Sequence, residues 1–356
     1  MSNSLASLNI SQLKNELNAG TISSLDIVND VIESIETRDS QVQAYVTINT
    51  EEALKNAEDA DISKPLGGIP IAIKDLINVK GQPCSCGSKI LEGSYSSTYD
   101  ATVIKRLKQA GAIPLGRVNM DEFAMGSSTE NSGIQITKNP WDLERIPGGS
   151  SGGSAASVAN DTAIASLGSD TGGSIRQPAS FCGTVGLKPS YGRVSRYGLV
   201  AFASSLDQIG PITKTSEDAA IILNSIAGKD ELDSTSLDSE VPDYLQSLNG
   251  DIKGLKIGMP KEYFTDGIDP EVLSCINDAI KTLTELGAEI VDISLPHTEL
   301  AVSTYYIIAT AEASANLARF DASDMGIATR TRQILSSITV NPELKALAKR
   351  SRGESY

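Results

Sequence analysis

Three serines stand beside paired glycines in two short segments of the chain. Residues 148–154 read Gly-Gly-Ser-Ser-Gly-Gly-Ser and contain Ser150 and Ser151, and residues 170–174 read Asp-Thr-Gly-Gly-Ser and end at Ser174. Glycines let the backbone approach a ligand closely and leave N–H groups free to point at an anion. A hydroxyl beside such donors is typical of nucleophilic catalysis, in which the serine oxygen attacks a carbonyl carbon and the amides hold the oxyanion.

Two other interpretations of the glycine-rich segments are weaker. A flexible linker would not enclose a run of small and apolar residues such as 155–167. A phosphate-binding loop would need Gly-x-x-x-x-Gly-Lys-Ser/Thr, or Gly-x-Gly-x-x-Gly after a strand, and neither pattern is present here. The run between the two segments instead predicts a short buried helix, a turn at 160–162 and a strand over 163–169.

A serine nucleophile needs a base, and the composition restricts the choice. The single histidine of the sequence, His297, follows an expected strand, where a surface loop position is usual, so a Ser-His-Asp triad is disfavoured. Lys74 ends the apolar, strand-like run 67–74, and Ser-Lys systems are a known alternative. Two interpretations of Lys74 stay open. It is either a strand-end lysine that reaches solvent, or a buried amine whose pKa is lowered until it is a usable base near neutral pH.

Together these segments resemble the signature of the amidase family. Lys74 stands where that family has its catalytic lysine, and Ser174 follows Ser150 at the family's spacing. The resemblance implies a Ser-Ser-Lys triad with Ser174 as nucleophile, Ser150 as proton relay on a cis peptide bond and Lys74 as base. It also implies an oxyanion hole made by the backbone N–H groups of Thr171, Gly172, Gly173 and Ser174.

Longer runs outside the signature resemble one branch of the family, the A subunits of glutamyl-tRNA(Gln) or aspartyl-tRNA(Asn) amidotransferases. These runs cover 119–131, 139–142, 188–198 and 204–211, and the likeness extends to about Asp321. It implies glutamine hydrolysis that supplies ammonia for converting Glu-tRNA(Gln) to Gln-tRNA(Gln), or Asp-tRNA(Asn) to Asn-tRNA(Asn). It also implies a heterotrimer with B and C subunits. No cofactor is expected on this chain; ATP and Mg are expected on the B subunit, which would hold most of the mischarged tRNA.

Two other function classes stay open. A stand-alone amidase acting on small amides would use the same triad without partners, and co-purification with B and C subunits would discriminate the two. A non-catalytic scaffold is disfavoured, because Lys74, Ser150 and Ser174 are all present.

Further candidates surround the triad. Asp170 and Arg176 flank the nucleophile, and the family resemblance favours a supporting role for both. Tyr305 and Tyr306 are candidates for the substrate pocket, although an aromatic pair on a helix of small residues is more often part of a core.

Composition bounds the class of protein. Hydrophobic residues make up 40% of the 356 residues but aromatic residues only 4%, as expected for an aliphatic core. No apolar run approaches the length of a membrane span, and Met1 is not followed by a signal peptide's basic start. The spacings of Cys84, Cys86, Cys182 and Cys275 fit no metal site, so we expect free thiols and a cytoplasmic protein. The formal charge of −15 disfavours unaided binding to nucleic acid.

Helix and strand signals alternate along the chain. Two amphipathic helices open it, the second capped by Ser23 with Asp26 three residues on. Helices are then predicted over 51–61, 102–110, 216–227, 270–286 and 301–317. Strands are predicted over 44–48, 112–115, 184–187, 255–258 and 290–295, and a polar loop over 229–249. This rhythm predicts an α/β fold, which the resemblance specifies as a central twisted mixed sheet covered by helices on both faces.

The end of the chain departs from the family pattern. After Phe320-Asp321 the family continues with Gly, a basic residue and Tyr-Gly, whereas residues 322–326 read Ala-Ser-Asp-Met-Gly. We therefore expect one amidase-signature domain over residues 1–356, lacking the C-terminal part usual for the family and with it part of the glutamine pocket.

Overall fold

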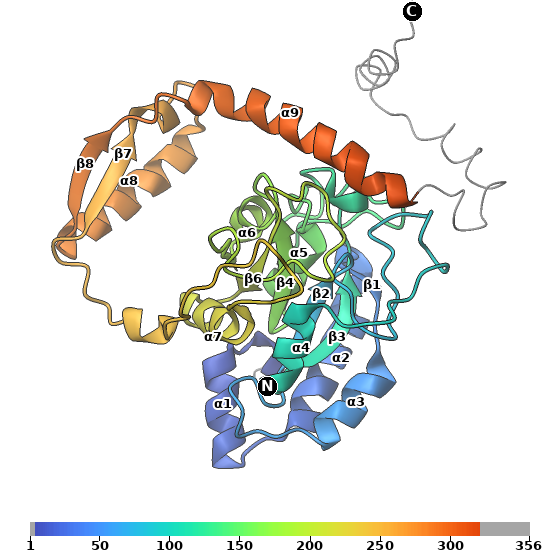
Figure 1. The fold of residues 1–356 in the computed structure, drawn as a ribbon. Helices are drawn as coiled ribbons and strands as arrows, with labels where there is room; N and C mark the ends of the chain where they lie inside the picture. The colour runs from blue at the N-terminus through green and yellow to red at the C-terminus, as the bar shows by residue number, and fades with distance from the viewer. Residues whose placement is uncertain (1–3, 321–356) are drawn as a thin grey trace, which may run out of the picture.

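A mixed β-sheet forms the centre of the molecule (Figure 1). The computed structural model describes residues 4–320, and within them six strands pair in the order β1-β3-β2-β4-β6-β5. The strands are β1 (Tyr45–Thr47), β2 (Pro70–Lys74), β3 (Ile113–Val118), β4 (Ala165–Asp170), β5 (Val185–Gly186) and β6 (Gln208–Thr213). β2 lies parallel to both of its neighbours, β3 and β4, whereas the other three pairings are antiparallel. The α/β fold with a mixed central sheet is therefore confirmed.

Both faces of the middle of this sheet are covered. Every residue of β2, β3, β4 and β6 is buried, a pattern that requires packing on each side. The covering helices are α1 (Ile10–Ala19), α2 (Ser24–Val42), α3 (Thr50–Glu58), α4 (Thr102–Gln109), α5 (Gly152–Ala159), α6 (Arg176–Cys182) and α7 (Ser216–Ile226). Lys74 thus ends a strand that is enclosed on all sides.

Local signals place several helix ends correctly. The Ser23 side chain accepts a hydrogen bond from the Asp26 N–H, and the Asp26 side chain accepts one from the Ser23 N–H, so the predicted cap of α2 is confirmed. Gly111 follows α4 with a φ of 90°, a conformation that glycine adopts without steric cost. Short 3-10 turns complete the pattern: η1 (Leu5–Ser7), η2 (Glu122–Ala124), η3 (Tyr244–Ser247), η4 (Lys261–Tyr263) and η5 (Ala318–Phe320).

One α-helix and one strand were not anticipated from the sequence. α6 follows directly after the serine at 174, and β6 pairs along the full length of β4. In addition, η3 lies inside the predicted loop 229–249. Gly210 and Pro211 inside β6 disfavour a strand, so the pairing with β4 outweighs local preference there, whereas Pro178 lies in the first turn of α6, where a helix tolerates proline.

A second, smaller unit follows the core. β7 (Lys256–Pro260) and β8 (Glu289–Ile293) form a parallel pair joined by α8 (Pro270–Glu285), and neither strand pairs with the central sheet. We call 256–293 the βαβ unit. α9 (Thr298–Leu317) runs from it back across the core, where Ala309 and Ala313 become buried (Figure 1). The expected departure after Phe320 lies outside the described residues, and the single domain over 1–356 stays a prediction.

Candidate active site

Lys74 lies at the inner end of β2 and contacts two serines. Its side chain is fully buried (0% exposed), so the interpretation as a strand-end lysine that reaches solvent is wrong. The Nζ atom donates to the Ser150 Oγ at 2.7 Å and to the Ser169 Oγ at 2.9 Å. An amine enclosed in this way is placed to exchange a proton with the Ser150 hydroxyl.

The surroundings of Lys74 set its charge state. Burial lowers the pKa of Lys74 from 10.5 to about 7, because the low-polarity interior disfavours the ammonium form. The negative charges of Asp121, Asp170 and Asp207 act in the opposite direction. A substantial fraction of Lys74 is therefore neutral at pH 7, as a general base requires.

Ser150 lies in a tightly enclosed turn before α5. The Gly149–Ser150 peptide bond is cis. The Thr129 hydroxyl donates to the Gly148 carbonyl oxygen at 2.8 Å and accepts from the Gly152 N–H at 3.1 Å, which clamps the turn from both ends. A Cβ atom at Gly152 would lie 2.1 Å from the Thr129 Oγ1, so glycine is required there by space. The glycines of this segment therefore bring backbone and hydroxyl groups close together.

Ser174 lies on the loop between β4 and α6, next to the Ser150 turn. Its carbonyl oxygen accepts a hydrogen bond from the Ser151 N–H at 3.1 Å, which joins the two glycine-rich segments. Among residues 4–320 the Ser174 hydroxyl has no hydrogen-bond partner, and Ser174 as a whole is 9% exposed. The structure thus brings Lys74 and Ser150 into direct contact and places Ser174 beside them through the backbone.

Asp170 and Arg176 hold the Ser174 loop. The Asp170 carboxylate accepts from the Gly173 N–H at 2.9 Å and from two guanidinium nitrogens of Arg176 at 3.0 Å each. Burial opposes ionisation, but the bonds from Arg176 keep the pKa of Asp170 below its usual value. These contacts fit the supporting role that the resemblance implies for both residues.

The expected oxyanion donors differ in their availability. The Gly173 N–H is committed to Asp170, whereas the N–H groups of Thr171, Gly172 and Ser174 make no hydrogen bond within the described part of the chain. The oxyanion role of Thr171, Gly172 and Gly173 stays a prediction, and Gly173 would have to release Asp170 to take part.

The two tyrosines of α9 have different surroundings. The Tyr305 ring lies against the nucleophile loop: a Cβ atom at Gly172 would be 2.6 Å from its Cε2. Tyr306 is 61% exposed. His297 is exposed and directly precedes α9. Only Tyr305 of the pair therefore lies beside the loop that carries Ser174, and the substrate-pocket role stays a prediction.

Sequence reasoning missed three buried polar groups around the triad: Ser169, Asp121 and Asp207. Ser169 directly precedes the second motif, and the Asp207 carboxylate accepts from the Thr171 hydroxyl at 2.6 Å. The one available signal was a charged or polar residue inside an otherwise apolar or glycine-rich run.

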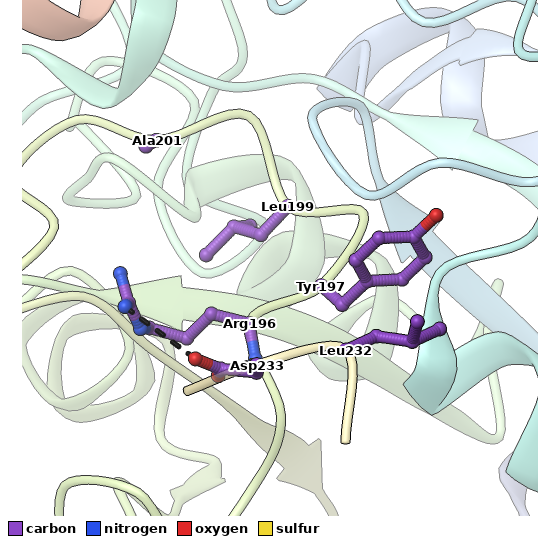
Figure 2. Close-up of a pocket in the computed structure, with 6 residues that line it drawn as sticks. All are labelled: Arg196, Tyr197, Leu199, Ala201, Leu232 and Asp233. Atoms are coloured by element: carbon purple, nitrogen blue, oxygen red, sulfur yellow. Dashed lines mark hydrogen bonds and ion pairs between the residues drawn. The ribbon is translucent and has the colours of Figure 1, made fainter. Parts of the chain in front are cut away.

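A small cavity is lined by a separate set of residues (Figure 2). It measures about 160 Å³ and is lined by Arg196, Tyr197, Leu199, Ala201, Leu232 and Asp233. Figure 2 shows the Arg196 guanidinium turned toward Asp233, and the closest nitrogen and oxygen of the pair are 3.7 Å apart. Because this pairing offsets the charge of Arg196, the cavity is not suited to an anion.

The thiols and the long helices add little to the site. Cys84, Cys86 and Cys182 are buried and Cys275 is exposed, and all four are unpaired. Over residues 4–320, no cluster of His, Cys, Asp and Glu side chains has the geometry of a metal site. Within the same residues, each helix is too short or too polar to span a bilayer.

Comparisons with known proteins agree with this geometry. The amidase family profile matches residues 26–353. The chain is 59% identical, over 318 residues, to the A subunit of the glutamyl-tRNA(Gln) amidotransferase of Methylacidiphilum infernorum; this match covers 89% of the chain and 64% of the relative. The solved structure of the corresponding Thermotoga maritima protein superposes with a TM-score of 0.80 at 42% identity, covering 99% of this chain and 74% of that one. A peptide amidase from Stenotrophomonas maltophilia reaches a TM-score of 0.82 at 29% identity, covering 93% and 73%.

Proposed function

The chain belongs to the amidase family, and from this premise we propose that it is the glutamine-hydrolysing subunit of a tRNA-dependent amidotransferase. The observation that carries the proposal is the buried contact between Lys74 and Ser150 beside the Ser174 loop. The 59% identity to an amidotransferase A subunit favours this assignment over other amidases. The chain spans 64% of that relative's length, so its activity, substrate and partners are all part of the proposal.

The proposed first step is acylation of Ser174. The Ser174 Oγ attacks the carboxamide carbon of glutamine, its proton passes to the Ser150 Oγ, and the Ser150 proton passes to the neutral Nζ of Lys74. The carbonyl oxygen becomes an oxyanion that the N–H groups of Thr171, Gly172 and Ser174 can receive, and one such donor contributes about 3 kcal/mol. Only the Lys74–Ser150 part of this relay corresponds to a hydrogen bond of the resting structure.

The second half of the reaction returns the proton. Lys74, now an ammonium, gives a proton back through Ser150 to the leaving nitrogen; the C–N bond of the tetrahedral intermediate breaks, ammonia departs and a γ-glutamyl ester of Ser174 remains. A water molecule then attacks the ester by the same relay and releases glutamate. The three side chains therefore act as one acid–base unit, with Tyr305 as a wall of the substrate pocket.

The proposed partners follow from charge and from the chemistry that this chain does not carry. A formal charge of −15 disfavours tRNA phosphate, and the sequence contains no Walker-type phosphate loop. Activation of the tRNA-linked carboxylate with ATP and Mg is assigned to the B subunit, within a cytoplasmic heterotrimer whose third chain is the C subunit. Whether Glu-tRNA(Gln) or Asp-tRNA(Asn) is served depends on the tRNA that the partner binds.

A reconstitution experiment tests this division of labour. The chain alone is expected to hydrolyse glutamine slowly, to bind tRNA poorly and to leave mischarged tRNA unamidated in the presence of glutamine, ATP and Mg. Addition of B and C subunits is expected to produce amidated tRNA and to raise glutaminase turnover. A stand-alone amidase would hydrolyse small amides at the same rate with and without the partners and would not co-purify with them. ATP-dependent amidation by the isolated chain would contradict the proposal.

A further inference from the structure

Asp121 is a buried carboxylate next to the triad that the proposed relay does not use. Asp121 is 0% exposed and directly precedes η2. The Asp121 N–H donates to the Ser150 carbonyl oxygen at 3.3 Å, so the main chains of Asp121 and Ser150 are in direct contact. Ser150 is therefore held by Lys74 through its hydroxyl and by Asp121 through its carbonyl oxygen.

The Asp121 side chain lies beneath the Gly149–Ser150 turn. A Cβ atom at Gly149 would be 2.1 Å from the Asp121 Oδ2, so the carboxylate occupies the space that a side chain would fill. The Oδ1 accepts from the Asn131 N–H at 3.2 Å, and the N–H groups of Ser128 and Thr129 also favour the ionised carboxylate, but among residues 4–320 no hydrogen bond of normal geometry reaches the Oδ2. An unpaired buried carboxylate oxygen is costly, and such a group calls for a functional explanation.

The other carboxylates that face Lys74 already have partners. Asp170 binds Arg176, and Asp75, which follows Lys74 in the chain, binds the buried Arg117 at 3.2 Å. The Asp207 carboxylate accepts from the Thr171 hydroxyl and from two backbone N–H groups, and Cys86 lies nearby. Of the charges acting on Lys74, that of Asp121 is the strongest. Asp121 and Asp207 thus both lack a cation of their own in the described part of the chain, and of these two Asp121 is the one whose main chain contacts Ser150.

We propose that Asp121 is the counter-charge of the proton relay: its carboxylate stabilises the ammonium that Lys74 becomes when it accepts the proton of the attacking serine. The proton moves from the Ser174 Oγ to the Ser150 Oγ and from there to the Lys74 Nζ. Asp121 stays ionised throughout and neither gives nor takes a proton. It acts through Lys74 and is a positioning residue. This inference rests on the proposed amide hydrolysis.

Asp121 and Lys74 each influence the charge of the other. Burial raises the pKa of Asp121, and the N–H groups of Thr129, Asn131 and Ser128 together with Lys74 act against that rise. The Asp121 charge favours the ammonium form of Lys74, so its removal would lower the pKa of Lys74 further. The neutral amine would then be present at lower pH but would be a weaker base.

The test uses Asp121→Asn, which removes the charge and keeps an oxygen that can accept from the Asn131 N–H. Its matched control is Glu130→Gln, which removes an exposed charge from the same loop. Three quantities are measured. Two come from the kinetics of amide hydrolysis, the midpoint of the acid limb of kcat/KM and the plateau kcat. The third is the titration midpoint of the Lys74 side chain by NMR of ¹³C-lysine-labelled protein. The Lys74 resonance is identified by its absence in Lys74→Met.

We expect Asp121→Asn to lower both midpoints by about one pH unit and to lower the plateau kcat about tenfold, while Glu130→Gln changes neither. A lower kcat with unchanged midpoints would show a purely structural role and overturn the proposal. Asp121→Ser is the second charge-removing variant, and failure of both variants to fold would also overturn it. If the wild-type chain hydrolyses no amide, the proposed function fails, but the NMR midpoint still decides whether Asp121 stabilises the Lys74 ammonium.

Discussion

The central sheet and the βαβ unit differ in how their side chains are shielded from water. In the sheet, even the charged groups Lys74, Asp75 and Arg117 are fully or almost fully buried and each has hydrogen-bond partners. In the βαβ unit, α8 buries no residue, and apolar side chains such as Val291 and Ile293 are exposed. Parallel strands are normally covered on both faces. Within the described residues, by contrast, most side chains of β7 and β8 are exposed or only half-buried.

This difference locates the chemistry. A lysine can act as a base near neutral pH only where water is excluded, and the enclosed end of β2 provides that environment for Lys74. The same lysine on the exposed strand β7 would stay protonated. The proposed catalytic site therefore belongs to the shielded region, and changes in the βαβ unit should leave its chemistry almost intact.

The largest expected effect is loss of amide hydrolysis on substitution of the triad. Ser174→Ala, Ser150→Ala and Lys74→Ala should each lower kcat by on the order of 10⁴-fold or more, and combining two of them should add little further loss. Glutamine turnover followed by ammonia release measures the effect. His297→Ala, at the border of the βαβ unit, is the control and should keep normal turnover. Near-normal activity of Lys74→Ala would remove lysine as the base.

The next effect concerns ion pairs in the two regions. Arg117→Met should cost about 3–5 kcal/mol of unfolding free energy, because it leaves the buried Asp75 carboxylate without its cation. Lys281→Met removes the exposed pair with Glu285 on α8 and should cost no more than about 0.5 kcal/mol. Urea unfolding of the full chain measures both. Equal costs would show that the two regions are equally shielded.

A matched pair of leucines gives the smallest and most direct comparison. Leu107→Ala in α4 should cost about 2–5 kcal/mol, because Leu107 is fully buried in the core. Leu286→Ala at the end of α8 should change the stability by no more than about 0.5 kcal/mol, because Leu286 is 59% exposed. Thermal and urea unfolding report both values. A cost above about 2 kcal/mol at Leu286 would mean that this side chain is covered in solution.

Elements with local signals could be predicted from the sequence, and elements that depend on distant partners could not. The caps at Ser23 and at Asp269 with Pro270 placed α2 and α8, because these signals act within one helical turn. β6 contains Gly210-Pro211 and exists because it pairs with β4. No rule that looks only along the chain supplies that pairing.

The same division applies to the site. Lys74, Ser150 and Ser174 stood out because their motifs are contiguous and specific. Ser169 and Asp121 gained their places from packing between segments far apart in sequence, so their contacts with Lys74 and Ser150 were not predictable. The burial of Lys74, left open from its pattern alone, was decided by the strands on either side of it.

The order of strands in the central sheet also has a consequence for biosynthesis. β2 lies between β3 and β4, so it gains its second neighbour only when Ala165–Asp170 has been made, long after Lys74 itself. At the usual rates of translation this delay is about 5–20 s. Throughout that interval one edge of the apolar strand Pro70–Lys74 is unpaired on the nascent chain. Among the pairings of the central sheet this one waits longest along the chain, so the strand that ends at Lys74 presents an open edge to other chains for the longest time while the protein is being made.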